Sequence, residues 1–157
     1  MQHIELAPGA IVALYHPMKD ELDTGPLAEA LAERGVALAL PVVTRQGAGL
    51  EFRRYKPGAD LLNGAHGTSH PREEASALPD ILVVPLLGFT RDGARIGYGG
   101  GYYDRTIAAL RAERPIVAVG YAFGAQEVAK LPVSPHDQRL DWIITEREAI
   151  RPAREAA

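Results

Sequence analysis

Short apolar runs that alternate with helical patterns constrain this chain more than any other feature of its sequence. Each run is rich in Val, Ile, Leu or Ala and has the length of one strand, whereas several of the intervening segments carry helical periodicity. This alternation predicts an α/β fold whose sheet is largely parallel and covered on both faces. The predicted strands are residues 10–15, 36–43, 81–87, 116–121 and 142–145, with a shorter alternating strand at 51–55.

Predicted helices lie between these strands. Pro26 suits the first turn of a helix and Gly35 suits its C-terminal cap, which places one helix after the first strand. Further helices are predicted over residues 101–110 and 125–131, and the strand at 142–145 should close the sheet. We expect the strand at 81–87 to be interrupted near its proline, and residues 56–79 to form an irregular loop of functional importance.

Length and composition narrow the class of protein. The chain has 157 residues, which suits one domain with a single core. A net charge of −3 argues against a nucleic-acid partner, and the absence of cysteine excludes disulfides and thiolate metal sites. No apolar stretch approaches the ~20 residues that cross a bilayer, and the N-terminus lacks the features of a secretory signal. We expect a cytoplasmic protein without a membrane partner, with a domain over residues 1–150 and a polar tail over residues 151–157.

A glycine-rich loop follows the most apolar strand, where parallel α/β sheets bind their ligands. Its core is Gly97-Tyr98-Gly99-Gly100-Gly101, immediately before a predicted helix. Glycine lets backbone N–H groups approach an anion without Cβ clashes, and the helix N-terminus adds its positive dipole end at the same place. The pattern therefore predicts a phosphate site, and ATP is the expected ligand.

Charged side chains around the loop fit this chemistry. Arg95 and Arg105 flank the loop and could clamp phosphate oxygens, while Asp104 could hold a magnesium ion against them. The loop is not a Walker A motif, because no Gly-Lys-Ser/Thr follows, and Tyr102 replaces the last glycine of the dinucleotide fingerprint. A tight turn without a ligand is the alternative interpretation, although three consecutive glycines are entropically costly where only a turn is needed.

At these residues the sequence resembles the 5-formyltetrahydrofolate cyclo-ligase family, also called methenyltetrahydrofolate synthetase. Its most specific motif is GYGGGYYDR at residues 97–105, with PLLGF upstream at residues 85–89. The resemblance implies a three-layer α/β/α fold, a single domain with a mainly parallel, Rossmann-like central sheet. It covers nearly the whole chain in the family's order, through residues 15–24, 40–43, 52–58, 79–89, 97–105, 118–123 and 135–146.

The resemblance implies an ATP-dependent ligase of one-carbon metabolism that forms a C–N bond. ATP phosphorylates the formyl oxygen of 5-formyltetrahydrofolate, N10 closes the ring, and phosphate leaves to give 5,10-methenyltetrahydrofolate and ADP. Phosphorylation turns a poor leaving oxygen into a good one, so catalysis is mainly positioning and charge stabilisation. The implied ligands are reduced folate, ATP and Mg²⁺, and we expect a monomer or a small homo-oligomer.

The resemblance also implies roles for individual residues. Catalytic roles fall on Tyr102 and Arg95, and magnesium ligation falls on Asp104 and Asp137. Considered alone, Glu21 and Asp137 would be solvated turn carboxylates. The implied ATP-binding residues are Arg95, Ile96, Gly97, Tyr98, Gly99, Gly100, Gly101, Tyr102 and Tyr103, and the implied folate-binding residues are His16, Met18, Glu21, Tyr98, Gly99, Gly100, Gly101 and Tyr102.

Two departures from the family pattern leave other functions open. Family members usually begin with a helix carrying a Lys and an Arg that contact ATP, whereas this sequence starts just before its first strand, so we expect that helix to be absent. His66 stands where the family commonly has an aromatic residue, and His70 where it has Glu or Gln; both could also be exposed loop residues without a role. The alternatives to an active cyclo-ligase are a homologue with an altered substrate and a catalytically silent folate- or nucleotide-binding module.

Overall fold

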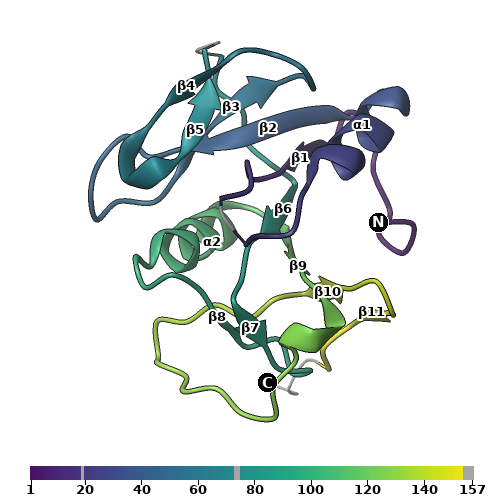
Figure 1. The fold of residues 1–157 in the computed structure, drawn as a ribbon, viewed down its shortest axis with the longest axis vertical. Coiled ribbons are helices and arrows are strands. Elements are labelled where there is room, and N and C mark those ends of the chain that lie inside the picture. The colour runs from purple at the N-terminus through teal and green to yellow at the C-terminus, as the bar shows by residue number, and fades with distance from the viewer. Residues whose placement is uncertain (19, 73–74, 154–157) are drawn as a thin grey trace.

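The computed structural model describes residues 1–18, 20–72 and 75–153, and it is built around one seven-stranded sheet (Figure 1). The strand order is β11-β10-β9-β6-β1-β2-β3. Neighbouring strands from β10 to β2 run parallel, whereas β3 and β11 add antiparallel edges. The strands are β1 (Ile11–Ala13), β2 (Ala37–Val42), β3 (Glu51–Tyr55), β6 (Ile81–Val84), β9 (Val117–Tyr121), β10 (Trp142–Ile144) and β11 (Ala149–Ile150).

Each face of this sheet packs against one helix, because consecutive side chains of a strand point to opposite faces. Val12 of β1 belongs to the same buried cluster as Leu31 of α1 (Gly25–Glu33). Its neighbour Ala13 belongs to the cluster that contains Ile107 and Leu110 of α2 (Tyr102–Glu113). The molecule therefore has helix, sheet and helix layers, and the predicted three-layer α/β class with a mainly parallel sheet is confirmed.

Several element ends lie where the sequence predicts them. Pro26 occupies the first turn of α1, and Gly35 takes a φ of 76° just after the C-cap, a conformation that residues with a Cβ adopt at a cost. β6 ends at Val84, directly before Pro85, as expected for a residue that cannot donate to a ladder.

The predicted helix over residues 125–131 is wrong. Only a 3₁₀ turn, η2 (Gly124–Gln126), forms there, and the chain then becomes irregular. The Gln126 side chain accepts a hydrogen bond from Phe123 N at 2.8 Å and donates to Leu86 O at 3.0 Å, while Val128 N donates to Phe89 O at 2.9 Å. These tertiary partners replace the hydrogen bonds that would continue a helix.

The segment predicted to be irregular contains a hairpin. β4 (Leu61–Asn63) pairs with β5 (Ser69–Pro71) across the short η1 turn (Ala65–Gly67), and β5 lies against β2 and β3 (Figure 1). A second small hairpin, β7 (Gly88–Phe89) with β8 (Arg95–Ile96), leads into the glycine loop. The strand at 142–145 does not close the sheet, because β11 adds an edge beyond it. Part of the predicted tail, residues 154–157, lies outside the described residues.

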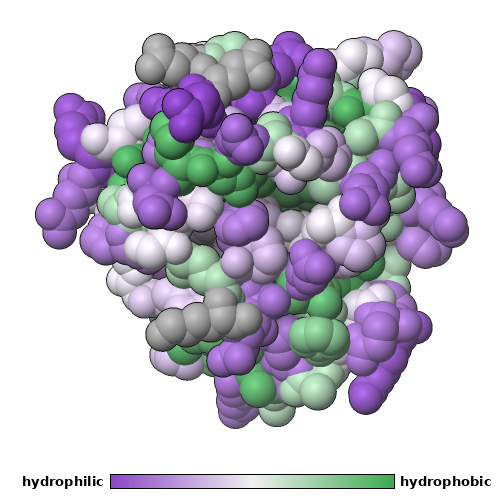
Figure 2. Space-filling model, turned by 45° about the horizontal axis from the view of Figure 1, so that its top comes forward, coloured by the Kyte–Doolittle hydropathy of each residue, from purple (hydrophilic) through white to green (hydrophobic). Residues whose placement is uncertain are grey.

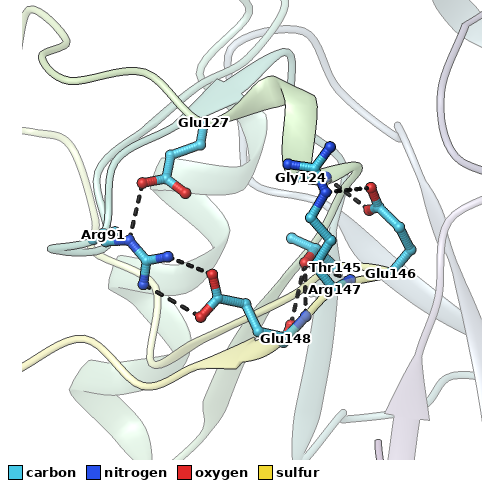
Figure 3. A network of polar contacts seen from close by, with 7 residues as sticks. All are labelled: Arg91, Gly124, Glu127, Thr145, Glu146, Arg147 and Glu148. Atoms are coloured by element: carbon cyan, nitrogen blue, oxygen red, sulfur yellow. Dashed lines mark hydrogen bonds and ion pairs between the residues drawn. The ribbon is translucent and has the colours of Figure 1, made fainter.

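A network of surface charges fixes the β7–β8 hairpin (Figure 3). Arg91, in the turn of the hairpin, donates to Glu127 Oε1 at 2.9 Å and pairs with both oxygens of Glu148. Nearby, Gly124 N donates to Glu146 at 2.7 Å. These contacts connect the hairpin to η2 and to the turn between β10 and β11, and so brace the strand that carries Arg95.

The surface mixes polar and apolar side chains, with apolar groups emerging between charged ones on the face shown in Figure 2. Ile96 and Tyr98, on either side of Gly97, are 41% and 55% exposed. In the part of the chain that the structure describes, neither helix combines the length and hydropathy required to span a bilayer.

Candidate functional site

A cavity of about 760 Å³ opens at the carboxyl ends of the parallel strands. Tyr15 follows β1, Val43 follows β2 and Pro85 follows β6, and all three line it. This is the edge at which open α/β sheets bind ligands, and the volume suits a small molecule of drug or cofactor size.

The cavity collects every residue to which the family resemblance assigns a binding, catalytic or metal-ligating role. They arrive from three separate segments of the chain, namely the turn after β1, the region from β8 to α2, and the loop before β10. The predicted residues that line it are His16, Met18, Glu21, Arg95, Ile96, Gly97, Tyr98, Gly99, Gly100, Gly101, Tyr102, Tyr103, Asp104 and Asp137. Their proximity agrees with a common site, and their individual roles remain predictions.

The glycine loop connects β8 to the first turn of α2. Gly99 and Gly101 have φ angles of 92° and 69°, which lie in the left-handed region that favours glycine. Gly101 is the N-cap of α2 and makes no side-chain cap, so the first N–H groups of the helix receive no capping hydrogen bond from it. The loop and helix end together form a backbone-lined wall that can accept an anion.

Arg95 lies beneath this wall. Its side chain is only 7% exposed, Nη2 donates to Asp104 Oδ1 at 3.1 Å, and the guanidinium lies 5.9 Å from the centre of the Tyr103 ring. Its buried Nε has no hydrogen-bond partner among the described residues. A buried donor without a partner is costly, which marks this nitrogen as a candidate donor to a bound anion.

The Asp104 side chain contacts the loop that carries Asp137. Asp104 Oδ1 accepts a hydrogen bond from Gln138 N at 3.0 Å, and the Asp137 carboxylate caps its own turn by accepting from Ser134 N at 2.8 Å. The described residues contain no group of three or more His, Asp or Glu side chains arranged as a metal site. Mg²⁺ often binds through one or two carboxylates together with phosphate oxygens and water, so this pair fits a magnesium ion carried by a nucleotide better than a resident metal.

Glu21 reaches the cavity from the turn after β1. Its Oε2 accepts a hydrogen bond from Met18 N at 2.8 Å. Burial raises the pKa of the Glu21 carboxyl above its ordinary value, and hydrogen bonds from Met18 and Tyr98 partly oppose that rise. A half-buried carboxylate in such a place binds N–H donors of a ligand strongly, because little water competes for them.

Two tyrosines near Glu21 stay protonated. Burial raises the pKa of Tyr15 and of Tyr103, and the charge of Glu21 raises both further. Tyr15 donates its hydroxyl proton to Leu22 O at 2.9 Å, which holds the turn that carries Glu21 against β1. The sequence motif did not single out Tyr15, although its position at the end of the first predicted strand could have done so.

Arg105 braces the glycine loop. Its Nη2 donates to Gly100 O at 2.8 Å and its Nε to Ala48 O at 3.2 Å, while its guanidinium lies 5.0 Å from the Tyr102 ring centre. The sequence favoured a phosphate clamp, but these donors already bind backbone carbonyls. Arg105 therefore differs from Arg95, whose buried Nε has no partner among the described residues.

Sequence reasoning missed much of one wall. His66, Thr68 and Ser69 reach the cavity from the η1 turn and β5, whereas His70 is not among the lining residues and its Nδ1 contacts Pro71 O at 3.1 Å. The segment after β2 also contributes, and the rule that ligands bind beyond strand ends could have found it. The additional lining residues of that segment are Val43, Gln46, Gly47 and Leu50.

Comparisons with known proteins agree on one family. The sequence model of the 5-formyltetrahydrofolate cyclo-ligase family matches residues 1–146. The chain is 37% identical over 140 residues to 5-formyltetrahydrofolate cyclo-ligase of Escherichia coli K12, covering 85% of this chain and 76% of that protein. The corresponding protein of Mycolicibacterium smegmatis is 30% identical over 151 residues, covering 90% and 76%.

Two similar solved structures belong to proteins with the same family activity in their names. The NMR structure of Aquifex aeolicus 5,10-methenyltetrahydrofolate synthetase superposes with a TM-score of 0.75 at 31% identity, covering 96% of this chain and 75% of that one. The 5,10-methenyltetrahydrofolate synthetase of Mycoplasma pneumoniae gives a TM-score of 0.63 at 26% identity, covering 85% and 71%.

Proposed function

Because this chain belongs to the 5-formyltetrahydrofolate cyclo-ligase family, we propose that it converts 5-formyltetrahydrofolate to 5,10-methenyltetrahydrofolate while ATP becomes ADP and phosphate. The observation that carries the proposal is the shared cavity. It is lined by the glycine loop, whose backbone can accept an anion, by a buried arginine whose Nε lacks a partner among the described residues, and by a half-buried carboxylate with raised pKa. One cavity can thus hold a nucleotide phosphate and a folate together.

The phosphate side of the cavity serves the first step. The γ-phosphoryl group passes to the formyl oxygen, and negative charge spreads over its oxygens during transfer. The loop N–H groups and Arg95 Nε are donors fixed before the substrate arrives, so they stabilise that charge without reorganisation. A magnesium ion bound with ATP would neutralise further phosphate charge, with Asp104 and Asp137 as its protein ligands.

The folate side of the cavity serves ring closure. Glu21 accepts hydrogen bonds from N–H groups of the pterin and so orients N10 toward the activated formyl carbon. When N10 attacks, the C–N bond forms, N10 releases its proton to solvent, and the C–O bond to the phosphorylated oxygen breaks so that phosphate leaves. Holding both groups in one cavity makes this step effectively unimolecular, which is the main source of rate that positioning can supply.

A second candidate keeps the ATP step and changes the acceptor. His66 lies on the cavity wall where family members commonly carry an aromatic ring, so a differently shaped substrate could be accepted here. Comparing 5-formyltetrahydrofolate with 10-formyltetrahydrofolate and simple N-formyl compounds as ATP-dependent substrates distinguishes the two candidates.

The test is an assay of the purified chain with 5-formyltetrahydrofolate and MgATP, followed through the near-ultraviolet absorbance of the methenyl product. Product should require ATP and should disappear in Asp104→Ala. The matched control is Asp60→Ala, which removes an exposed carboxylate that does not line the cavity. Absence of product in the wild-type chain at saturating ATP would refute the proposal.

A further inference from the structure

The turn of the β4–β5 hairpin contacts the first residue of α2 across the cavity. His66 Nε2 lies 3.2 Å from the hydroxyl oxygen of Tyr102, and the ring centres are 5.9 Å apart with a 50° interplanar angle. Both residues line the cavity. The contact therefore connects the hairpin wall, which the glycine motif does not encode, with the loop that binds the anion.

The backbone of the turn fixes the direction in which the His66 side chain leaves the chain. His66 has φ 57° and ψ 32°, and it is the one non-glycine residue with positive φ in the described part of the chain. Gly64 N donates to Thr68 O at 2.8 Å, and Thr68 N and Oγ1 donate to Ala65 O at 3.1 and 2.6 Å. A left-handed residue costs about 1 kcal/mol or more, and these bonds hold it in place.

The Tyr102 ring is held from two further sides. A Cβ on Gly100 would lie 2.9 Å from the ring, so the loop backbone packs directly against it, and the Arg105 guanidinium covers the ring at 5.0 Å. These contacts restrain the ring but leave the direction of its hydroxyl proton open. The imidazole of His66 supplies the missing partner.

We propose that His66 is a positioning residue that acts through Tyr102, fixing its hydroxyl as a hydrogen-bond acceptor toward the cavity. A phenol is the better donor and a neutral imidazole nitrogen the better acceptor, so Tyr102 donates to Nε2 and the proton of His66 resides on Nδ1. The lone pairs of Tyr102 then face the ligand and select an N–H or O–H donor on the substrate. The inference rests on the proposed function, since it assigns substrate selection within that same site.

A double-mutant cycle measures the coupling between the two side chains. His66→Phe keeps an aromatic ring without an acceptor, and Tyr102→Phe keeps the ring without a hydroxyl. We expect Tyr102→Phe to lower kcat/KM for 5-formyltetrahydrofolate about threefold more in the wild-type background than in the His66→Phe background, the size of one exposed hydrogen bond. If the two effects simply multiply, the positioning role is refuted. His66→Asn repeats the cycle with a side chain that tolerates positive φ but is too short to reach Tyr102.

Side-chain ¹⁵N NMR tests the contact without any catalysis. In the wild-type protein, neutral His66 should be mainly the tautomer with its proton on Nδ1, and Tyr102→Phe should increase the population with the proton on Nε2. An unchanged tautomer population refutes the inference even if the enzyme is active. If no cyclo-ligase activity exists, the NMR result still decides whether His66 fixes Tyr102, so the two proposals fail separately.

Discussion

The two walls of the cavity are built in different ways. The wall proposed to bind phosphate, called the phosphate wall below, consists of backbone N–H groups of the glycine loop and the start of α2, with Arg95 buried beneath them. A second wall consists of side chains such as Glu21 and His66, which come from turns and a short hairpin. A wall made of backbone requires glycine at particular φ angles and so leaves a sequence motif. A wall made of side chains leaves no such motif, and a single substitution in it can change which substrate the cavity accepts.

Removing Arg95 should break the phosphate wall with the largest effect. Arg95→Ala eliminates the buried Nε donor and the ion pair with Asp104, so kcat should fall about 10²- to 10³-fold, as when one preorganised donor to a developing anion is lost. Steady-state kinetics at saturating ATP measures this. Arg54→Ala, an exposed arginine outside the cavity, should leave kcat unchanged. An Arg95→Ala enzyme within threefold of wild type would show that this wall does not carry the charge of the reaction.

Replacing either of two glycines with positive φ by alanine gives a matched pair of variants, one of which should show the next largest effect on kinetics. Gly101→Ala and Gly58→Ala both place a Cβ at positive φ, 69° and 84°, so each should lose about 1 kcal/mol of stability in urea unfolding. Only Gly101 lines the cavity, and its Cβ would approach Arg105 Nη1 at 2.8 Å. The KM for ATP should therefore rise about tenfold in Gly101→Ala alone. Equal kinetic effects in the two variants would contradict a backbone-defined site.

Changing Glu21 should affect the side-chain wall selectively. Glu21→Gln keeps the size of the side chain but weakens its acceptance of N–H groups, so kcat/KM for 5-formyltetrahydrofolate should fall about tenfold while the KM for ATP stays the same. Varying each substrate in turn separates the two constants. A rise in the KM for ATP of the same size would mean that the two walls are not separate in function.

The smallest predicted effect is a pH-dependent change in Tm when Glu21 is replaced. Burial raises the pKa of Glu21, so folding favours its protonated form. The resulting stabilisation is complete below the pKa of the unfolded chain and is lost as pH rises through the raised pKa of the folded protein. Glu21→Gln should therefore raise Tm slightly near neutral pH, and the gain should vanish below about pH 4. Thermal unfolding across this pH range checks the sign; a gain that persists in acid would refute it.

The fold was predictable wherever a strand or helix is long enough to show its period. Buried strands such as β6 and the helix after the glycine loop appear as apolar runs or capped periodic segments. The β4–β5 hairpin was not predictable, because each of its strands has only three residues, the segment between them contains Gly64 and Gly67, and the hairpin depends on packing against β2 and β3. The helix expected over residues 125–131 failed because Gln126 binds distant carbonyls instead of its own turn.

The candidate site shows the same difference between residues with a local sequence pattern and residues placed by tertiary structure. The position of residues 95–104 on the cavity was predictable, because a glycine-rich loop before a helix leaves a local pattern, whereas their roles remain predictions. His66 was visible only as a departure from the family pattern, and its contact with Tyr102 depends on how the hairpin folds over the loop. The brace formed by Arg105 with Ala48 and Gly100 likewise depends on tertiary structure that no local pattern encodes.

The most direct test of this account is a crystal structure of the chain with 5-formyltetrahydrofolate and a non-hydrolysable ATP analogue. A γ-phosphate oxygen should lie within about 3.2 Å of Arg95 Nε, with the formyl oxygen beside it and the pterin against Glu21. A triphosphate bound elsewhere, with Arg95 Nε still lacking a partner, would contradict the assignment of the two walls.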